Sequence, residues 1–183
     1  AVVEKNSEAL YAVSNALKND KEVVMVAVAQ NGDMLKYASA ELQADKDVVM
    51  VALSEYEKFK PLEFNDANDG STCKNIMTRF KADKEIVMAV MRNYGQMLES
   101  ASSEFRADKQ VVMVAVSNNE GWGKNALKSA SSELRADKEV VMVAVKSYGG
   151  ALKYASQDLK YDKEIVMAAV TQNVIALEYA SDE

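Results

Sequence analysis

The chain repeats one phrase, D-K-E-V-V-M-V-A-V with small variations, six times. The aspartate that opens each copy falls at Asp20, Asp45, Asp83, Asp108, Asp137 and Asp162. Successive copies are 25, 38, 25, 29 and 25 residues apart, so the repeat is 25 residues long with insertions of 13 and 4 residues. A fixed period of this length is typical of a repeat array, in which each unit buries its apolar side on its neighbours. Positions in a repeat are counted below from this aspartate.

A second phrase, A-L-K-Y-A-S-x-x-L-K-x-D, leads into each aspartate. Leucine recurs at position −10, in Leu10, Leu35, Leu98, Leu127 and Leu152, with Leu177 in the last, partial repeat. Leucine or phenylalanine recurs at position −3, in Leu17, Leu42, Phe80, Phe105, Leu134 and Leu159. Serine recurs at position −6, in Ser14, Ser39, Ser102, Ser131, Ser156 and Ser181. Because the same type of residue returns at the same position, the sequence predicts repeats that stack in register.

The start of each repeat has the signature of a helix N-terminus. An aspartate before Lys-Glu and an apolar run places a carboxylate where it accepts hydrogen bonds from free amides and offsets the helix dipole. Turn signals such as Asn31-Gly32 and Gly149-Gly150 then end the helix. The phrase A-L-K-Y-A predicts a second, shorter helix, and the serine at position −6 predicts the cap of one further helical turn.

A β-strand is the alternative for V-V-M-V-A-V, because the run is short and rich in β-branched residues. The alanine within the run and the aspartate before it favour a helix that neighbouring repeats cover on both flanks. We therefore expect an all-α fold, a right-handed α-helical repeat solenoid of about six to seven helix-turn-helix units. It would form a single array over residues 1–183, with insertions at about 54–71 and 117–125.

Residues 151–170, A-L-K-Y-A-S-Q-D-L-K-Y-D-K-E-I-V-M-A-A-V, resemble the tandem helical repeat called domain of unknown function 4116. The resemblance extends over the chain outside the two insertions. It implies a helical repeat fold and brings no activity with it. Residues 72–77, T-C-K-N-I-M, depart from the A-L-x-Y-A-S of the other repeats. The repeat pattern therefore predicts the second helix of this repeat less clearly than those of the other repeats.

Composition argues against several classes of function. The net charge of −6 disfavours nucleic acid, whose phosphates bind basic surfaces. The chain has no histidine, the most common general base near neutral pH and the most common zinc ligand. Its one cysteine, Cys73, excludes a disulfide within the chain and a cysteine-only metal site. We expect no enzymatic activity, no catalytic residue, no cofactor and no bound metal.

The apolar segments are too short to cross a membrane. The longest unbroken apolar run, residues 23–29, has seven residues, whereas a spanning helix needs roughly 18 or more. We expect no membrane-spanning helix. We also expect an intracellular or organellar interior rather than secretion.

Methionine recurs at position +5, in Met25, Met50, Met88, Met113, Met142 and Met167. We interpret this column as part of the stacked core, although a row of exposed methionines would suit an adaptable docking groove. Cys73 occupies the −10 position that leucine fills elsewhere. That position predicts a buried, unreactive thiol.

The two insertions carry aromatic residues outside the repeat pattern. Tyr56, Phe59 and Phe64 belong to the longer insertion, and Trp122 lies between two glycines in the shorter one. Both insertions fall between the first and second helix of their repeat, so we expect them at the same edge of the array. The aromatic residues could form a partner-binding site or fold back over their own repeat, and the sequence leaves both alternatives open.

The first and last repeats lack a charged helix that would cap the array. The apolar residues at these places, which we interpret as candidates for packing against partner chains or against more of this same chain, are Val2, Val3, Leu10 and Val13, and Val174, Ile175, Leu177 and Tyr179. We expect a non-enzymatic protein–protein interaction or scaffold module with other protein chains as partners. The alternative is a structural or accessory subunit packed in a larger multi-protein assembly, including an organellar one. A carrier of a hydrophobic ligand is a more distant alternative.

The aspartate at the start of each helix gives a first prediction. Asp108→Ala should lower the free energy of unfolding by about 0.5–2 kcal/mol, because the cap of the following helix is lost, and Asp108→Asn should lower it less. Urea or thermal denaturation measures both. An unchanged melting curve for Asp108→Ala would contradict the capping role.

Overall fold

The computed structural model describes residues 9–56, 71–118 and 126–180, and all regular secondary structure in these ranges is helical. The chain divides into two compact parts, Ala1–Ala89 and Val90–Glu183, called the first and second part below. The prediction of helices rather than strands is therefore confirmed for the described residues. Five sequence candidates lie outside them: Phe59, Phe64, Trp122, Val2 and Val3.

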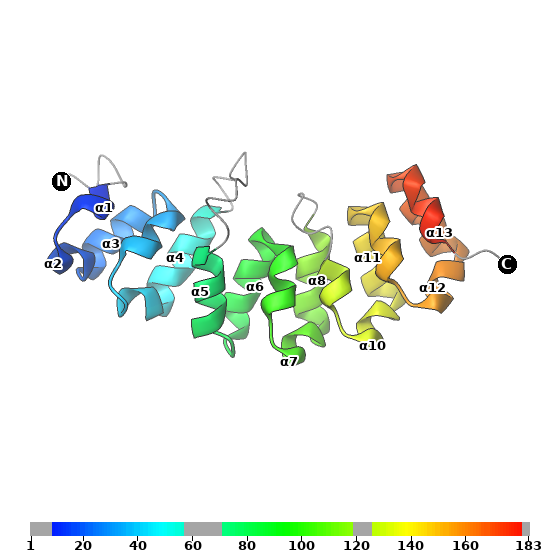
Figure 1. Ribbon diagram of the computed structural model, residues 1–183, viewed down its shortest axis with the longest axis horizontal. Coiled ribbons are helices and arrows are strands. Elements are labelled where there is room, and N and C mark those ends of the chain that lie inside the picture. Colours follow the sequence, from blue (N-terminus) through cyan, green and yellow to red (C-terminus); the bar gives the residue numbers. More distant parts are fainter. Residues whose placement is uncertain (1–8, 57–70, 119–125, 181–183) are drawn as a thin grey trace. The chain divides into compact units, whose positions relative to one another are not determined.

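The first part alternates α-helices with short 3-10 helices, labelled η (Figure 1). Its elements are α1 (Ala9–Ala12), α2 (Asn15–Lys18), α3 (Lys21–Val28), η1 (Gly32–Tyr37), η2 (Leu42–Ala44), α4 (Lys46–Tyr56), α5 (Ser71–Arg79) and α6 (Lys84–Asn93), within which the boundary between the parts falls. Helix α3 packs on α4, and η1 packs against both of them. The predicted long helix is present in each repeat of this part. The shorter helix that follows α3 is η1, which is a 3-10 helix rather than an α-helix.

The second part repeats the same arrangement. Its elements are η4 (Gly95–Ser100), α7 (Ser103–Arg106), α8 (Lys109–Ser117), α9 (Ala126–Ser129), α10 (Ser132–Arg135), α11 (Lys138–Ser147), η5 (Gly149–Tyr154), α12 (Gln157–Tyr161), α13 (Lys163–Gln172) and η6 (Val174–Tyr179). The long helices α8, α11 and α13 lie side by side in that order (Figure 1). The shorter elements α9, η5 and η6 form a second row along them.

The repeat aspartates cap the long helices as predicted. In all six, Oδ1 accepts hydrogen bonds from the backbone amides at positions +2 and +3, with donor–acceptor distances of 2.9–3.2 Å. The serine hydroxyl at position −6 accepts from the amide at position −3 in Ser14, Ser39, Ser102 and Ser131. Four of the repeats therefore contain two capped helix starts, which fix where their helices begin.

The core is built from the same positions in each repeat. Positions +3, +4, +7 and +8 of the long helix are apolar and point to one side of it, because a helix turns 100° per residue. In α11 these are Val140, Val141, Ala144 and Val145, which are 0–2% exposed. The leucine at position −10 is equally buried, as Leu35, Leu98, Leu127 and Leu152 show with 0–2% exposure.

The methionine column does not belong to this core, so that interpretation is wrong. Met25, Met50, Met88, Met113 and Met142 are half-buried, and Met167 is 57% exposed. The reason is geometric: position +5 lies well over 100° around the helix from the centre of the buried stripe. Truncation of Met113 should therefore cost less than the roughly 2–5 kcal/mol of a core methionine.

The repeat with the altered phrase has a different second helix. Its T-C-K-N-I-M segment lies in α5, an α-helix of nine residues, where the other repeats have a 3-10 helix or a single helical turn. Cys73 in α5 is 2% exposed, and burial raises the pKa of its thiol to about 12. The prediction of a buried thiol is confirmed, and so high a pKa keeps the thiol protonated and unreactive at neutral pH.

A lysine connects the aspartate cap to the preceding repeat at Asp45, Asp83, Asp137 and Asp162. The lysine at position +1 binds the aspartate of the next repeat and the acidic residue two positions after it, with Nζ–O distances of 2.7–3.2 Å. We call this three-residue arrangement the lysine clamp. The clamps are Lys21–Asp45–Asp47, Lys46–Asp83–Glu85, Lys109–Asp137–Glu139 and Lys138–Asp162–Glu164.

The clamp aspartates use both carboxylate oxygens. Oδ1 of Asp137 caps α11, while Oδ2 accepts from Lys109 of the preceding repeat at 2.7 Å. This hydrogen bond is the largest cause of the lowered pKa of Asp137, and the same cause lowers the pKa of Asp45, Asp83 and Asp162. One side chain therefore sets both where a helix begins and how it sits on its neighbour.

A backbone hydrogen bond joins successive repeats at a second point. The amide of the serine at position −6 donates to the carbonyl oxygen at position −2 of the preceding repeat, at 2.8–2.9 Å in three cases: Ser39 to Lys18, Ser131 to Arg106 and Ser156 to Arg135. Together with the clamp, this bond fixes the register of one repeat on the next.

The clamps predict an acid-sensitive contribution to stability. The pKa of Asp137 is lower in the folded chain than the value near 3.9 of an unfolded aspartate, so its stabilisation is complete above that pH and is lost as the pH falls through the folded pKa. Lys109→Met should therefore lower the free energy of unfolding at pH 7, and the difference from the unmodified chain should shrink toward about pH 2.

Urea denaturation at low ionic strength measures this difference, because salt screens exposed ion pairs. Lys146→Met is the matched control, since Lys146 is also exposed on α11 but lies outside the clamps. An effect of Lys109→Met that does not change with pH would contradict the clamp.

Candidate functional site

The docking residues predicted from the sequence differ in their exposure in the structure, and several lie outside the described residues. Tyr56 is the last residue of α4, and the other insertion aromatics and the first valines lie outside the described residues. Leu10 is fully buried, because α1 packs on η1, so its expected exposure is wrong. Ile175 is 55% exposed and Tyr179 is half-buried. The last repeat therefore carries the candidates that the structure places at the surface.

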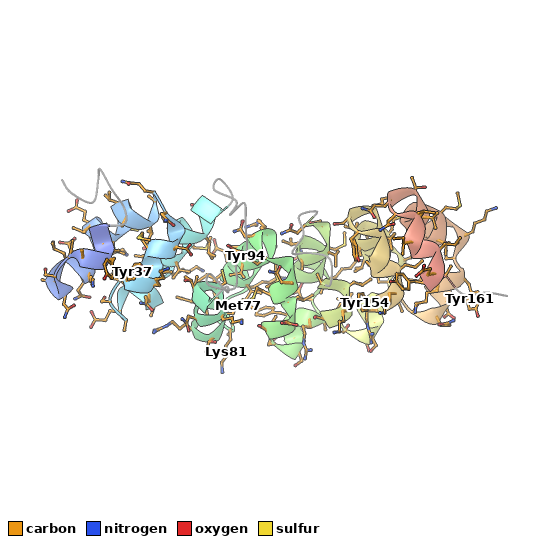
Figure 2. The ribbon with its side chains drawn as sticks, turned by 45° about the horizontal axis from the view of Figure 1, so that its top comes forward. Tyr37, Met77, Lys81, Tyr94, Tyr154 and Tyr161 are labelled. Carbon is orange, nitrogen blue, oxygen red and sulfur yellow. The ribbon has the colours of Figure 1, made fainter. Side chains whose placement is uncertain are left out.

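The last repeat exposes a set of apolar side chains that we call the C-face. It consists of Tyr161 on α12, Met167 on α13, and Val174, Ile175 and Leu177 on η6, which are 49–71% exposed. Tyr161 lies at the end of the second part that carries α13 (Figure 2). Nearby, Lys153 lies over the Tyr179 ring, with Nζ 5.7 Å from the ring centroid. An apolar set of this size on one repeat is typical of an interaction surface.

Several positions of the C-face are more exposed than the equivalent positions in other repeats. Leu177 is 59% exposed, whereas Leu98 and Leu152 at the same position are fully buried. Val166 and Val170, at positions +4 and +8 of α13, are half-buried, although Val141 and Val145 of α11 are 0% exposed. Position +3 does not differ, because Ile165 is fully buried on α11. The C-face is thus the side of the repeat that a following repeat covers elsewhere in the chain.

Tyr161 belongs to the same side. In the first part, Asn19 at this position accepts a hydrogen bond from the hydroxyl of Ser39 in the next repeat, at 2.6 Å. The residue at position −1 therefore faces the following repeat. Other repeats have asparagine or alanine here, and these residues are exposed, so Tyr161 adds an aromatic ring at a position that is open to solvent throughout the described repeats.

The C-face also carries an unused cation. Lys163 stands at position +1, where the equivalent lysines form clamps, and it has no carboxylate partner among the described residues. The Glu164 carboxylate beside it already binds Lys138 at 2.8 Å. The surface thus combines exposed apolar side chains with one exposed positive charge at the N-terminal end of α13.

The opposite side of the first repeat is less open. Leu17 is 42% exposed and Val23 is half-buried, whereas Leu42 and Val48 at the same positions are 8% and 0% exposed. However, α1 covers part of this side, and Tyr11 of α1 contacts Tyr37 edge-on with ring centroids 5.6 Å apart. The exposed apolar surface here is smaller than the C-face.

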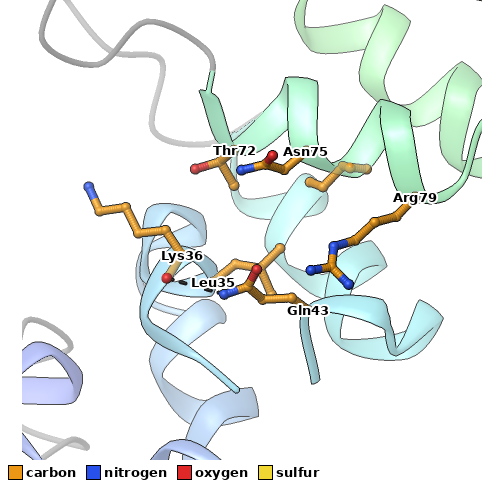
Figure 3. Close-up of a pocket in the computed structure, with 7 residues that line it drawn as sticks. Leu35, Lys36, Gln43, Thr72, Asn75 and Arg79 are labelled. Carbon is orange, nitrogen blue, oxygen red and sulfur yellow. Dashed lines mark hydrogen bonds between the residues drawn. The ribbon is translucent and has the colours of Figure 1, made fainter. Parts of the chain in front are cut away.

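A small pocket in the first part is a second candidate (Figure 3). Its walls come from η1, η2 and α5, and the space amounts to about 240 Å³, including the part open to solvent. Gln43 in its wall donates to the carbonyl oxygens of Lys36 and Ala38 at 3.2 and 2.9 Å. Nη1 of Arg79 lies 3.4 Å from the Ala40 carbonyl oxygen. These polar groups hold neighbouring segments together, which is a structural role.

Neither surface has a recognisable catalytic arrangement. Within the described residues, no three His, Cys, Asp or Glu side chains gather so as to hold a metal ion. Over the same residues, no helix has the length and apolar character needed to cross a bilayer. What the C-face can do chemically is to bury apolar surface and pair one lysine with an acidic group.

The stacked helices, the recurring clamps and the exposed last repeat define the class as a tandem helical-repeat protein. The chain belongs to the family Domain of unknown function (DUF4116), whose model matches residues 1–43, 83–135, 122–160 and 137–183. The predicted family is therefore confirmed. No curated protein and no solved structure matches the chain significantly.

Sequence reasoning found part of the C-face and missed the rest. It named Val174, Ile175 and Leu177 from the absence of a closing helix. It did not name Lys163, Met167 or Tyr161. The signal for Lys163 was present, because a lysine follows every repeat aspartate, but a single repeat does not reveal which partner that lysine reaches.

A pair of leucines tests whether the C-face is open in solution. Leu152→Ala should lower the free energy of unfolding by about 2–5 kcal/mol, as expected for a buried leucine. Leu177→Ala, at the same repeat position but 59% exposed, should cost less than about 1 kcal/mol. Urea denaturation compares the two, and similar losses would show that Leu177 is buried.

Proposed function

We propose that the chain is a non-enzymatic protein-interaction module that binds another protein chain through the C-face. One observation carries this proposal: five apolar side chains of the last repeat are 49–71% exposed, and one of them, Leu177, holds a position where the leucines of the other described repeats are 0–2% exposed. Fully burying such a side chain is worth about 1.5–3 kcal/mol, so covering the exposed part of five of them would favour association.

The chemistry of the C-face supports binding rather than catalysis. Lys163 is the one charged side chain that we assign to this surface, and its acidic neighbours Asp162 and Glu164 pair with Lys138 rather than standing free as a catalytic acid or base. Because catalysis depends on positioned groups of that kind, we propose no enzymatic activity and no cofactor. The net charge of −6 supports a protein partner over nucleic acid. We place the protein in an intracellular or organellar interior.

A structural or accessory subunit in a larger multi-protein assembly, including an organellar one, is the second candidate. It is favoured by the additional exposure on the first repeat, where Leu17 and Tyr11 are 42% and 67% exposed. A hydrophobic-ligand carrier has less support, because five of the seven side chains that line the pocket are polar and its cavity volume is only about 10 Å³, whereas drug-sized sites are usually about 300–1,000 Å³.

We also propose that the repeats form a right-handed solenoid of about six to seven helix-turn-helix units. The same lysine clamp occurs in both compact parts, which supports one stacking geometry along the chain. Small-angle X-ray scattering of the full chain would test this. An elongated scattering profile agrees with a single array, and a compact globular profile contradicts it.

The interaction function is tested by affinity capture with a variant that changes only the C-face. The 183-residue chain and its Leu177→Lys variant, which is changed at an exposed site, should be compared by quantitative mass spectrometry of the proteins that each binds from an extract of the source organism. We expect specific proteins that the unmodified chain retains and Leu177→Lys loses.

Thr171→Lys is the matched control, because Thr171 is exposed on α13 and its substitution adds the same charge without removing an apolar C-face side chain. It should retain the same proteins as the unmodified chain. Identical sets of bound proteins for Leu177→Lys and the unmodified chain would contradict the proposal.

A further inference from the structure

The pocket in the first part lies between two successive repeats. One wall is the face of α5 that carries residues 72, 75, 76 and 79, which lie on one side of the helix because they are three, four and seven positions apart. The other wall consists of Leu35 and Lys36 on η1 and Gln43 on η2 (Figure 3). All seven lining residues belong to the same compact part of the chain.

Two residues of α5 depart from the repeat pattern in their chemistry, and both line this pocket. Arg79 stands at position −4, where four other repeats have an acidic residue: Glu41, Glu104, Glu133 and Asp158. Thr72 stands at position −11, where the other repeats have alanine or methionine: Ala9, Met34, Met97, Ala126, Ala151 and Ala176. Residues 44–82, which include α5, also lie outside the segments that the family model matches. The repeat pattern therefore does not account for the polar residues of this pocket.

The Thr72 hydroxyl is a buried polar group. Thr72 is 9% exposed, and its hydroxyl forms no hydrogen bond with another described residue. A buried hydroxyl without a hydrogen bond destabilises a fold unless something else supplies a partner. Because position −11 is apolar in the other repeats, their packing does not need a hydroxyl there. The hydroxyl therefore indicates a polar ligand that enters the pocket.

The charge on the lining of the pocket is positive. Arg79 and Lys36 are its charged residues, and no carboxylate is part of the lining. Arg79 forms no ion pair with a described residue, and its Nη1 atom reaches only the Ala40 carbonyl oxygen, at the long distance of 3.4 Å. The amide of Gln43 is already used, because it donates to two backbone carbonyl oxygens at 2.9 and 3.2 Å. The pocket thus offers an unpaired guanidinium that is held beside a fixed wall.

We propose that this pocket binds the carboxylate group of a short aliphatic ligand. Arg79 pairs with the carboxylate, whose two oxygens match the planar fork of a guanidinium. The Thr72 hydroxyl and the Asn75 amide donate hydrogen bonds to the same group. Leu35 and Ile76, the two apolar residues of the lining, contact the aliphatic chain.

The charge of the pocket favours a carboxylate over a phosphate. Lys36 lies over the Tyr37 ring, with Nζ 5.1 Å from the ring centroid, so its charge is already stabilised by that ring. One cation, Arg79, is then left to neutralise the ligand. A carboxylate carries a single negative charge, whereas a phosphate monoester carries about 1.5 to 2 at neutral pH.

The size of the pocket limits the ligand. Its enclosed volume is about 10 Å³, whereas the space that includes the part open to solvent is about 240 Å³. An enclosed volume of roughly 10–15 Å³ holds one water-sized group. One carboxylate oxygen therefore occupies the enclosed end, and the rest of the ligand lies in the open part. Free short-chain acids and the glutamate side chains of peptides both present such a group.

The test is a titration of the 183-residue chain with sodium butyrate, followed by the NMR chemical shifts of backbone amides. We expect saturable shifts confined to the two walls, residues 35–43 and 72–79, with a Kd on the order of 1 mM, because a ligand with one ion pair and few atoms binds weakly. Sodium chloride at the same concentrations is the control for ionic strength. Equal shifts with chloride, or shifts spread over the whole chain, would overturn the proposal.

Arg79→Gln removes the positive charge and should weaken butyrate binding about tenfold or more. Lys74→Gln is the matched control, because Lys74 is exposed on the same helix but does not line the pocket. This control should leave the Kd unchanged. Circular dichroism checks that both variants keep their helices. Equal effects of the two changes would contradict the role of Arg79 and with it the proposal.

Thr72→Val removes the hydroxyl and keeps nearly the same shape. It should weaken butyrate binding about threefold or more. It should not lower the urea midpoint, because a buried hydroxyl without a partner in the chain does not stabilise the fold. Unchanged binding would overturn the proposal, and so would a lower midpoint, which would show that the hydroxyl has a partner within the chain.

A second probe identifies the source of the carboxylate. N-acetylglutamate α-amide presents a side-chain carboxylate on a peptide backbone, and its binding should also depend on Arg79. The tighter of the two probes shows whether the site takes a free acid or a peptide side chain. Inorganic phosphate that binds more tightly than either probe would overturn the assignment to a carboxylate. These results are independent of the C-face, so this proposal and the interaction function fail separately.

Discussion

The fold depends on a carboxylate that has two partners. One oxygen of the repeat aspartate caps its own helix, and in the four observed clamps the other oxygen accepts the lysine of the preceding repeat. The same residue therefore starts a helix and sets its position on its neighbour. Exposed ion pairs are weak on their own, so most of the stability comes from the buried valines and leucines. The clamp contributes chiefly register.

The proposed interaction function follows from this division of roles. A repeat offers a lysine and an apolar surface on one side, and an aspartate with an acidic neighbour on the other. In the last repeat, the lysine side is exposed as the C-face, with Lys163 beside Met167 and Leu177. The apolar positions that pack repeats together inside the chain are thus among those that we propose for binding another protein.

Local features could be predicted from the sequence, and relations between repeats could not. The caps at Asp108 and Asp137 were predictable, because an N-cap involves residues two and three positions away. The burial of Met113 was predicted wrongly, because recurrence alone does not tell which side of a helix a position occupies. Leu152 and Leu177 have the same surroundings in sequence yet differ from 0% to 59% exposure, since the difference lies in the neighbouring repeat. The clamp partners of Lys109 were missed for the same reason.

A double-mutant cycle on Lys109 and Glu139 tests most directly whether the clamp couples successive repeats. These residues are 2.8 Å apart between repeats, and unlike Asp137, Glu139 does not cap the helix through its side chain. The free energy of unfolding would be measured at low ionic strength for Lys109→Glu, Glu139→Lys and the exchanged pair. The account predicts that each single change destabilises the chain and that the exchange recovers most of the loss. Additive losses in the exchanged pair would show that the clamp does not couple the repeats.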